Sequence, residues 1–221
     1  MAIFSLNEVR TEQIKNIADD NFDSWPENAL YGYYLGGQVP TTVKTVDRLD
    51  FSNETTSAPG DELPVGKVGL KALSSSSYGY FGGGYRQPPP VFFDTIDRLD
   101  FSNETLSLPG NELPQARNLL SAVSSNSYGY FVGGNVPGGS DRVDRIDFSN
   151  ETTSEPGNEL PQGRYDAAAL SSNSYGYFGG GVTPPGAVTT IISRIDFSNE
   201  TTSAPGNNFP ITKTDAAGLS N

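Results

Sequence analysis

One aromatic stretch that ends in glycines occurs four times in this chain of 221 residues. The copies read YGYYLGG, YGYFGGG, YGYFVGG and YGYFGGG, and they open at Tyr31, Tyr78, Tyr128 and Tyr175. Successive copies start 47, 50 and 47 residues apart. Self-similarity at a period of about 48 residues indicates one supersecondary unit built several times, so the repeat constrains the fold more than any single motif does.

Each repeat contains four segments that we expect to be short strands. Consecutive Tyr and Phe residues in the aromatic strand indicate that both of its faces are buried. A loop of different sequence follows, then an alternating strand such as 46–51, a Ser-Asn-Glu-Thr turn and a short strand such as 55–57. A segment of small residues such as 164–170 ends the repeat. Four short strands in about 48 residues are typical of a β-propeller blade, so we predict an all-β propeller of four repeats.

The chain therefore divides into a segment 1–30 outside the repeat and a repeat region 31–221. The repeat units are 31–77, 78–127, 128–174 and 175–221. In the first segment, Ser5 and Glu8 have the spacing of a capping box. Four apolar residues then fall close to one helical face, which predicts a short amphipathic helix: Leu6, Val9, Ile14 and Ile17. This helix either packs on its own domain or anchors the chain on a partner.

Composition excludes several function classes. The net charge of −12 disfavours nucleic-acid binding, because an acidic chain repels phosphates. No apolar run approaches the ~20 residues of a membrane-spanning helix, and the N-terminus lacks the features of a secretion signal. The chain has no His and no Cys, which excludes Ser-His or Cys-His nucleophiles and disfavours zinc and copper sites. We therefore expect no catalytic residues, no metal and no cofactor, although calcium binding at the acidic turns stays open.

Two further motifs recur in every unit. An Arg and an Asp lie two residues apart on one strand face, and we expect structural ion pairs between blades rather than a ligand-binding ring of charge. These residues are Arg48 with Asp50, Arg98 with Asp100, Arg145 with Asp147, and Arg194 with Asp196. The Asn-Glu-Thr sequence after each pair is formally a glycosylation acceptor, but we interpret it as a turn that uses Asn and Thr for backbone hydrogen bonds.

The loops after the aromatic strands are the most variable parts of the repeat. They span residues 38–44, 85–94, 135–141 and 182–190. Loops on a rigid scaffold commonly carry binding, and the second loop is the longest and most aromatic. Its candidate binding residues are Arg86, Gln87, Phe92 and Phe93. The alternative is that the loops differ only because nothing constrains them.

The order of segments also predicts how the propeller closes. The first repeat opens on its aromatic strand, and the last segment, 215–221, has the small-residue pattern that precedes the other aromatic strands. We expect this segment to pair with the first repeat and complete its blade, because ring closure protects exposed strand edges. A four-bladed ring, an open arc and a ring built from several chains all stay possible.

The order of these segments resembles the kelch repeat over residues 31–221. The shared features are a small-residue strand, an aromatic strand ending in Gly-Gly, a variable loop, a V-x-R-x-D strand and an outer strand. The outer strand of kelch blades usually carries a Trp, whereas this chain has a serine there: Ser57, Ser107, Ser154 and Ser203. The resemblance implies a kelch-like β-propeller with a degenerate repeat.

The near-identical copies of DFSNETTSAPG and SSNSYGYFGGG are also similar to repeats of kelch-like virion proteins of marine bacteriophages. This resemblance implies a non-enzymatic structural protein of a tail fibre or other appendage, located in the virion. It implies that residues 1–30 dock on other virion proteins, that the loops meet a host receptor or glycan, and that the chain forms a homo-oligomer or part of a larger assembly. The alternatives are a cytoplasmic kelch-type adaptor that binds a protein partner and, third, a carbohydrate-active lectin or enzyme.

Overall fold

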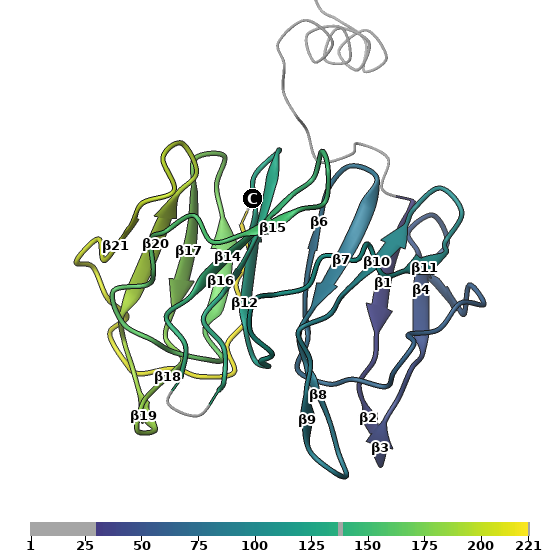
Figure 1. Ribbon diagram of the computed structural model, residues 1–221, viewed down its shortest axis with the longest axis horizontal. Helices are drawn as coiled ribbons and strands as arrows, with labels where there is room; N and C mark the ends of the chain where they lie inside the picture. Colours follow the sequence, from purple (N-terminus) through teal and green to yellow (C-terminus); the bar gives the residue numbers. More distant parts are fainter. Residues whose placement is uncertain (1–29, 137–138, 221) are drawn as a thin grey trace, which may run out of the picture. The chain divides into compact units, whose positions relative to one another are not determined.

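Each aromatic repeat forms a β-strand in the computed structural model, which describes residues 30–136 and 139–220 (Figure 1). These strands are β1 (Tyr31–Leu35), β7 (Tyr78–Gly82), β13 (Tyr128–Val132) and β17 (Tyr175–Gly179). The expected N-terminal helix, with its apolar residues Leu6, Val9, Ile14 and Ile17, lies outside the described residues.

The aromatic strands organise four antiparallel sheets. Their orders are β1-β4-β5, β11-β10-β7-β6, β12-β13-β14-β15 and β16-β17-β20-β21, here called the first to fourth sheets. The alternating strands are β4 (Val46–Asp50), β10 (Ile96–Asp100), β14 (Val143–Asp147) and β20 (Ile192–Asp196). The outer strands are β5 (Thr55–Ser57), β11 (Leu106–Ser107), β15 (Thr153–Ser154) and β21 (Thr202–Ser203). The small-residue strands are β6 (Lys71–Ser74), β12 (Ser121–Ser124) and β16 (Ala168–Ser171). The described residues contain no helix, so the all-β expectation is confirmed.

The register of each sheet places an aromatic ring beside a guanidinium. Tyr80 of β7 lies directly opposite Arg98 of β10, and the same pairing recurs in the other three sheets. Side chains directly opposite each other on antiparallel strands share one face and are within contact distance. The strand pairing therefore sets one Tyr and one Arg together on the same face of every sheet.

The apolar core lies between consecutive sheets. One buried cluster joins Leu73 and Tyr80 of the second sheet to Phe131 and Ile146 of the third. The glycine in the aromatic strand allows this close approach, because a Cβ at Gly129 would lie 2.5 Å from the side chain of Leu73. A unit of this kind does not bury its faces alone and depends on its neighbours for its core.

The expected closure strand is not formed, so this prediction was wrong. Residues 215–220 have no strand, and within the described residues the first sheet has three strands where the others have four. Gly218 instead lies beside Ala169 of the fourth sheet. The other small-residue strands pair with the aromatic strand that follows them within a few residues, whereas pairing with β1 requires closure of most of the chain, which costs more conformational entropy.

Candidate functional site

Three of the variable loops form two-stranded hairpins. They consist of β2 (Gln38–Val39) with β3 (Thr41–Thr42), β8 (Tyr85–Arg86) with β9 (Val91–Phe92), and β18 (Val182–Thr183) with β19 (Ala187–Val188). Figure 1 shows all three at the same end of their sheets, at the bottom of the view. We call this group the hairpin edge.

The two glycines after each aromatic strand fix the base of the hairpin. In the second sheet they are Gly83 and Gly84, with φ values of +68° and +101° that side-chain-bearing residues rarely adopt. The amide of Gly84 donates a hydrogen bond to the carbonyl of Arg117 at 2.9 Å, and the amide of Phe93 donates to the carbonyl of Gly84 at 2.9 Å. The scaffold thus holds the start and the end of this hairpin in place.

The four candidate binding residues of the second hairpin lie in different environments. Arg86 and Gln87 are exposed, and Phe92 is 40% exposed with its ring centroid 6.2 Å from that of Tyr85. Phe93 is half-buried, and the ammonium of Lys67 lies 5.1 Å from its ring centroid. The structure therefore places Arg86, Gln87 and Phe92 on the surface, while Phe93 belongs to the base of the hairpin.

A buried basic side chain lies under each junction between consecutive sheets, which the sequence analysis missed. Lys67 Nζ contacts Asp97 Oδ2 at 2.5 Å, Arg117 pairs with Asp144, and Arg164 donates to the hydroxyl of Ser193 at 2.6 Å. The signal was present in the sequence as a Pro followed three residues later by Lys or Arg in every unit, at positions 67, 117, 164 and 213. Each base belongs to the segment that precedes a small-residue strand.

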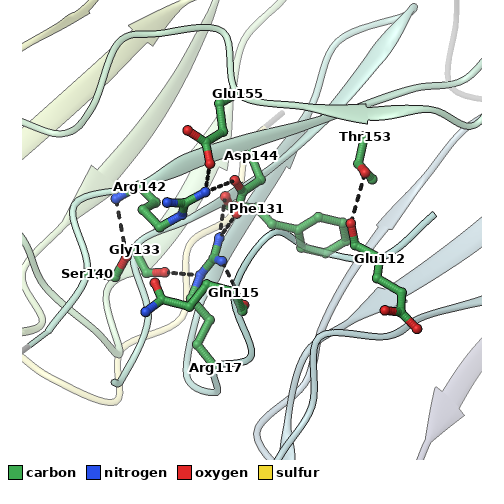
Figure 2. Close-up of polar contacts among 10 residues, drawn as sticks. All are labelled: Glu112, Gln115, Arg117, Phe131, Gly133, Ser140, Arg142, Asp144, Thr153 and Glu155. Atoms are coloured by element: carbon green, nitrogen blue, oxygen red, sulfur yellow. Dashed lines mark hydrogen bonds and ion pairs between the residues drawn. The ribbon is translucent and has the colours of Figure 1, made fainter. Parts of the chain in front are cut away.

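Arg117 has the fullest set of partners (Figure 2). Its Nε donates to the carbonyl of Gly133 at 2.7 Å and its Nη1 to that of Gln115 at 3.1 Å, while Nη2 pairs with Asp144. Burial lowers the pKa of Arg117, and the charge of Asp144 opposes this shift. A buried pair whose remaining hydrogen bonds are satisfied is stable as a pair, but loss of one partner leaves an uncompensated charge. This pair therefore has a structural role between two sheets.

A second polar residue in Figure 2 continues this network to the surface. Arg142 contacts the other carboxylate oxygen of Asp144 at 3.5 Å and also pairs with Glu155. A hollow of about 50 Å³ opens beside Arg142 and Glu155. It is smaller than the ~300–1,000 Å³ of most small-molecule sites, so it does not by itself indicate a ligand pocket.

Three of the four arginines expected to form inter-blade pairs contact a neighbouring sheet, but through a glutamate, whereas Arg194 has no such pair among the described residues. Nη1 of the arginine lies 2.8–2.9 Å from the carboxylate of the Glu in the next unit's Ser-Asn-Glu-Thr turn. The pairs are Arg48 with Glu104, Arg98 with Glu151, and Arg145 with Glu200. The hydroxyl of an aromatic-strand Tyr donates to the same carboxylate at 2.9–3.0 Å in each case.

The expectation that the aspartates pair between sheets was wrong. These residues are Asp50, Asp100, Asp147 and Asp196, and each accepts bonds from the amide and hydroxyl of the Ser two residues later in its own turn. A carboxylate at the start of a turn satisfies backbone donors that a partner in another sheet would leave open. These hydrogen bonds hold the pKa of each aspartate below its usual value.

The turn that follows explains both the Asn and the Glu of the repeat. In the first copy, Asn53 Oδ1 accepts from the amide of Thr55 at 3.0 Å and from its hydroxyl at 2.6 Å, as the turn interpretation expects. The intervening Glu54 has a φ of +59°, and the other three copies have the same conformation. Glu rarely adopts this region, and such strain persists where the surrounding structure determines it. In the second to fourth copies, it directs the carboxylate toward the preceding sheet.

The tyrosines of these junctions have raised pKa values. Burial is the largest cause for Tyr33, Tyr80 and Tyr130, and the hydrogen bond to the glutamate carboxylate adds to it. These phenols stay protonated at neutral pH and act as hydrogen-bond donors. The polar groups at the junctions are thus paired with one another, which suits them to holding the sheets together.

Within residues 30–136 and 139–220, no group of three or more acidic, His or Cys side chains is placed to bind a metal ion. In the same described part of the chain, no helix has the length and apolar character needed to cross a membrane.

Comparison with known proteins found no protein-family model that matches the sequence and no curated protein similar to it. The geometry of the hairpin edge and of the sheets below it is therefore the basis for the function proposed for this chain.

Proposed function

We propose that this chain is a kelch-like β-propeller scaffold that binds a partner through its hairpin edge, as a non-enzymatic structural or host-adsorption protein of a phage virion. The observation that carries the proposal is the hairpin edge itself: three hairpins of different sequence project from the same end of sheets whose sequence is nearly constant (Figure 1). Variable loops on a rigid scaffold are the usual arrangement of a binding protein.

The order and contacts of the sheets support the kelch-like interpretation. Each complete sheet runs from a small-residue strand through an aromatic strand and a V-x-R-x-D type strand to a short outer strand. The small-residue strand β12 contacts β6 on one side and β16 on the other. Strands of small residues that meet one another suit the innermost position of a propeller, where blades converge.

The distribution of polar side chains between the sheet junctions and the second hairpin supports binding rather than catalysis. The charged side chains at the junctions are paired with one another, while Arg86 and Gln87 are exposed on the second hairpin. Phe92 beside Tyr85 adds an exposed aromatic surface. An aromatic residue next to an Arg and a Gln is a common composition for binding hot spots and for contacts with sugar rings.

The virion assignment rests on the similarity of the repeats to kelch-like virion proteins, and it assigns residues 1–30 to attachment on the particle. We expect a chain that lacks residues 1–25 to fold but not to be incorporated into virions. Incorporation of the truncated chain at the wild-type level would show that attachment lies elsewhere.

The function of the hairpin edge is tested by adsorption of virions that carry the double substitution Arg86→Ala with Phe92→Ala. We expect the adsorption rate to fall about tenfold or more, which corresponds to about 1.4 kcal/mol in the activation free energy of adsorption. Leu108→Ala is the matched control, because Leu108 is 52% exposed and directly follows β11, the outer strand of the second sheet. Unchanged adsorption of the double variant, or absence of the protein from purified virions, would contradict the proposal, and capture of a cellular protein by the wild-type hairpin edge would favour the adaptor alternative.

A further inference from the structure

The three junctions between consecutive sheets are copies of one another. At each junction, an Arg and a Tyr of one sheet meet a Glu and a Phe of the next. Tyr33 stacks on Phe101, Tyr80 on Phe148 and Tyr130 on Phe197, with ring centroids 5.5–5.8 Å apart. Each Tyr also donates to the Glu that pairs with the Arg beside it.

The first and fourth sheets each present one half of such a junction that meets no second half among the described residues. On the fourth sheet, Arg194 and Tyr177 occupy the Arg and Tyr positions, and no ion pair or hydrogen bond from the described residues reaches the Arg194 guanidinium. On the first sheet, Glu54 is exposed and Phe51 is 52% exposed, whereas the equivalent Phe and Glu residues at the three junctions are half-buried. The Arg and Tyr that the fourth sheet leaves without a partner are thus complementary to the Phe and Glu that the first sheet leaves without a partner.

Both halves already have the conformation found at the occupied junctions. Glu54 has a φ of +59°, the same value as Glu104, which pairs with Arg48. The Arg194 guanidinium lies 4.4 Å from the centroid of the Tyr175 ring, as Arg48 lies 4.5 Å from that of Tyr31. A preorganised surface has less conformational entropy to lose on association.

Two further positions are complementary in the same way. At the occupied junctions, Leu73 lies against Gly129 and Val123 against Gly176, while the equivalent Leu170 of the fourth sheet is 38% exposed. The glycine that corresponds to Gly129 in the first sheet is Gly32. In addition, Asp47 is exposed on the first sheet at the position where Asp97 and Asp144 are buried beneath a base.

The base that would reach Asp47 is Lys213. It has the position in its unit that Lys67 and Arg117 have in theirs, and its carbonyl accepts from the amide of Gly181 at 2.7 Å as that of Arg117 does from Gly84. Its ammonium lies 4.8 Å from the ring centroid of Phe209, and no salt bridge from the described residues reaches it. The two surfaces therefore match in two charge pairs, one aromatic stack and one apolar contact.

We propose that the first sheet of one copy of this chain docks head to tail on the fourth sheet of a second copy, repeating the internal junction. Glu54 of one copy then pairs with Arg194 of the other, Phe51 stacks on Tyr177, Leu170 packs on Gly32, and Lys213 reaches Asp47. A head-to-tail contact joins two different surfaces, so it builds a closed ring of two or more copies or an extended assembly. This association is independent of what the hairpin edge binds.

The test is the native mass in solution of two charge reversals, each alone and mixed. Wild-type protein is expected at multiples of its 23.6 kDa. Arg194→Glu sets like charges against Glu54 of the neighbouring copy, and Glu54→Arg sets like charges against Arg194, so each variant alone should dissociate, with a dissociation constant raised about 30-fold or more. A 1:1 mixture restores opposite charges at both kinds of contact and should reassemble.

Three outcomes would overturn the proposal: wild-type protein that stays monomeric at high micromolar concentration, single variants that keep the wild-type mass, or a mixture that stays monomeric. The last outcome separates association of copies from closure within one copy, which mixing does not affect. Lys44→Glu and Glu112→Arg are the matched control reversals, since both residues are exposed and outside the two docking surfaces, and both should retain the wild-type mass. Equal melting temperatures of all variants under dissociating conditions show that the reversals leave the fold intact.

Discussion

The first and third sheets have nearly the same strand sequences but very different environments. Phe131 in the third sheet is fully buried, whereas Tyr34 at the same position of the first sheet is 63% exposed. Asp144 is buried beneath Arg117, and its equivalent Asp47 is exposed. The third sheet has a sheet on either side and its own small-residue strand, whereas in the part of the chain that the structure describes no such strand pairs with β1. A residue of this repeat therefore stabilises the fold only when a neighbouring sheet completes its surroundings.

Removing the buried carboxylate of the third sheet should have the largest effect. Asp144→Ala leaves the Arg117 guanidinium buried without its counter-charge, so we expect the free energy of unfolding to fall by about 3–5 kcal/mol. Asp47→Ala makes the same change at the exposed position and, in the Arg194→Glu background where copies do not associate, should change it by less than about 0.5 kcal/mol. Urea unfolding of both variants measures the comparison, and equal losses would contradict it.

Filling the central glycine of the aromatic strand should have the next largest effect. A Cβ at Gly129 would lie 2.5 Å from Leu73 of the neighbouring sheet and 3.0 Å from Ile146, so Gly129→Ala should cost about 1–3 kcal/mol by overpacking. At Gly32 the nearest side chain is Phe51, which is exposed and free to move aside. Gly32→Ala should therefore cost less than Gly129→Ala in thermal unfolding. The reverse order would mean that the close approach of sheets does not explain the glycine.

Local patterns predicted the strands well, because the signals for them lie within a few residues. The aromatic run, the alternation at 46–51 and the small-residue segments all became strands. The same local logic failed at 215–220, whose sequence resembles 166–171 but which has no strand. A strand needs a partner edge as well as a suitable sequence, and that partner is set by tertiary structure.

The partner of each repeated arginine could not be predicted for a similar reason. Asp50 lies two residues from Arg48 on the same strand face, but it accepts hydrogen bonds from Ser52 in its own turn, and Glu104 reaches Arg48 from the next unit. The sequence does not reveal that Glu104 adopts a positive φ that turns it toward the preceding sheet. At the candidate site, the variable loops predicted where the hairpin edge lies. The sequence did not predict that Phe92 is exposed and Phe93 half-buried, because this depends on which face of the hairpin each side chain occupies.

Loss of the junction glutamate should have a moderate effect. Glu151 accepts two bonds from Arg98 and one from the hydroxyl of Tyr80, so Glu151→Ala should lower the free energy of unfolding by about 1–2 kcal/mol, since these groups are only half-buried. Glu54→Ala is the matched change on the first sheet and should leave the stability of a single copy unchanged. The measurement is made in the Arg194→Glu background, so that association of copies does not contribute. A loss at position 54 as large as that at position 151 would show that Glu54 has a partner within its own copy.

The smallest effects should appear in the pH dependence of stability, where Asp147 and Asp215 are expected to act in opposite directions. Hydrogen bonds from Ser149 hold the pKa of Asp147 below its usual value, so its contribution is present above that value and is lost as the pH falls through the lowered pKa. The pKa of Asp215 is raised, chiefly by its hydrogen bond to Asp166, so its contribution is present at low pH and is lost as the pH rises through the raised pKa.

Unfolding titrations from pH 3 to pH 7 of two variants test these signs. Ser149→Ala should remove part of the acid-side loss of stability that wild-type protein shows, because it removes the hydroxyl bond that lowers the pKa of Asp147 most, while the bond from the backbone amide of residue 149 stays. Asp215→Asn should instead raise stability near neutral pH relative to wild type, since it removes the repulsion between Asp215 and the Asp166 carboxylate once both are charged. If both variants shifted the stability profile in the same direction, the opposite pKa shifts assigned to Asp147 and Asp215 would be contradicted.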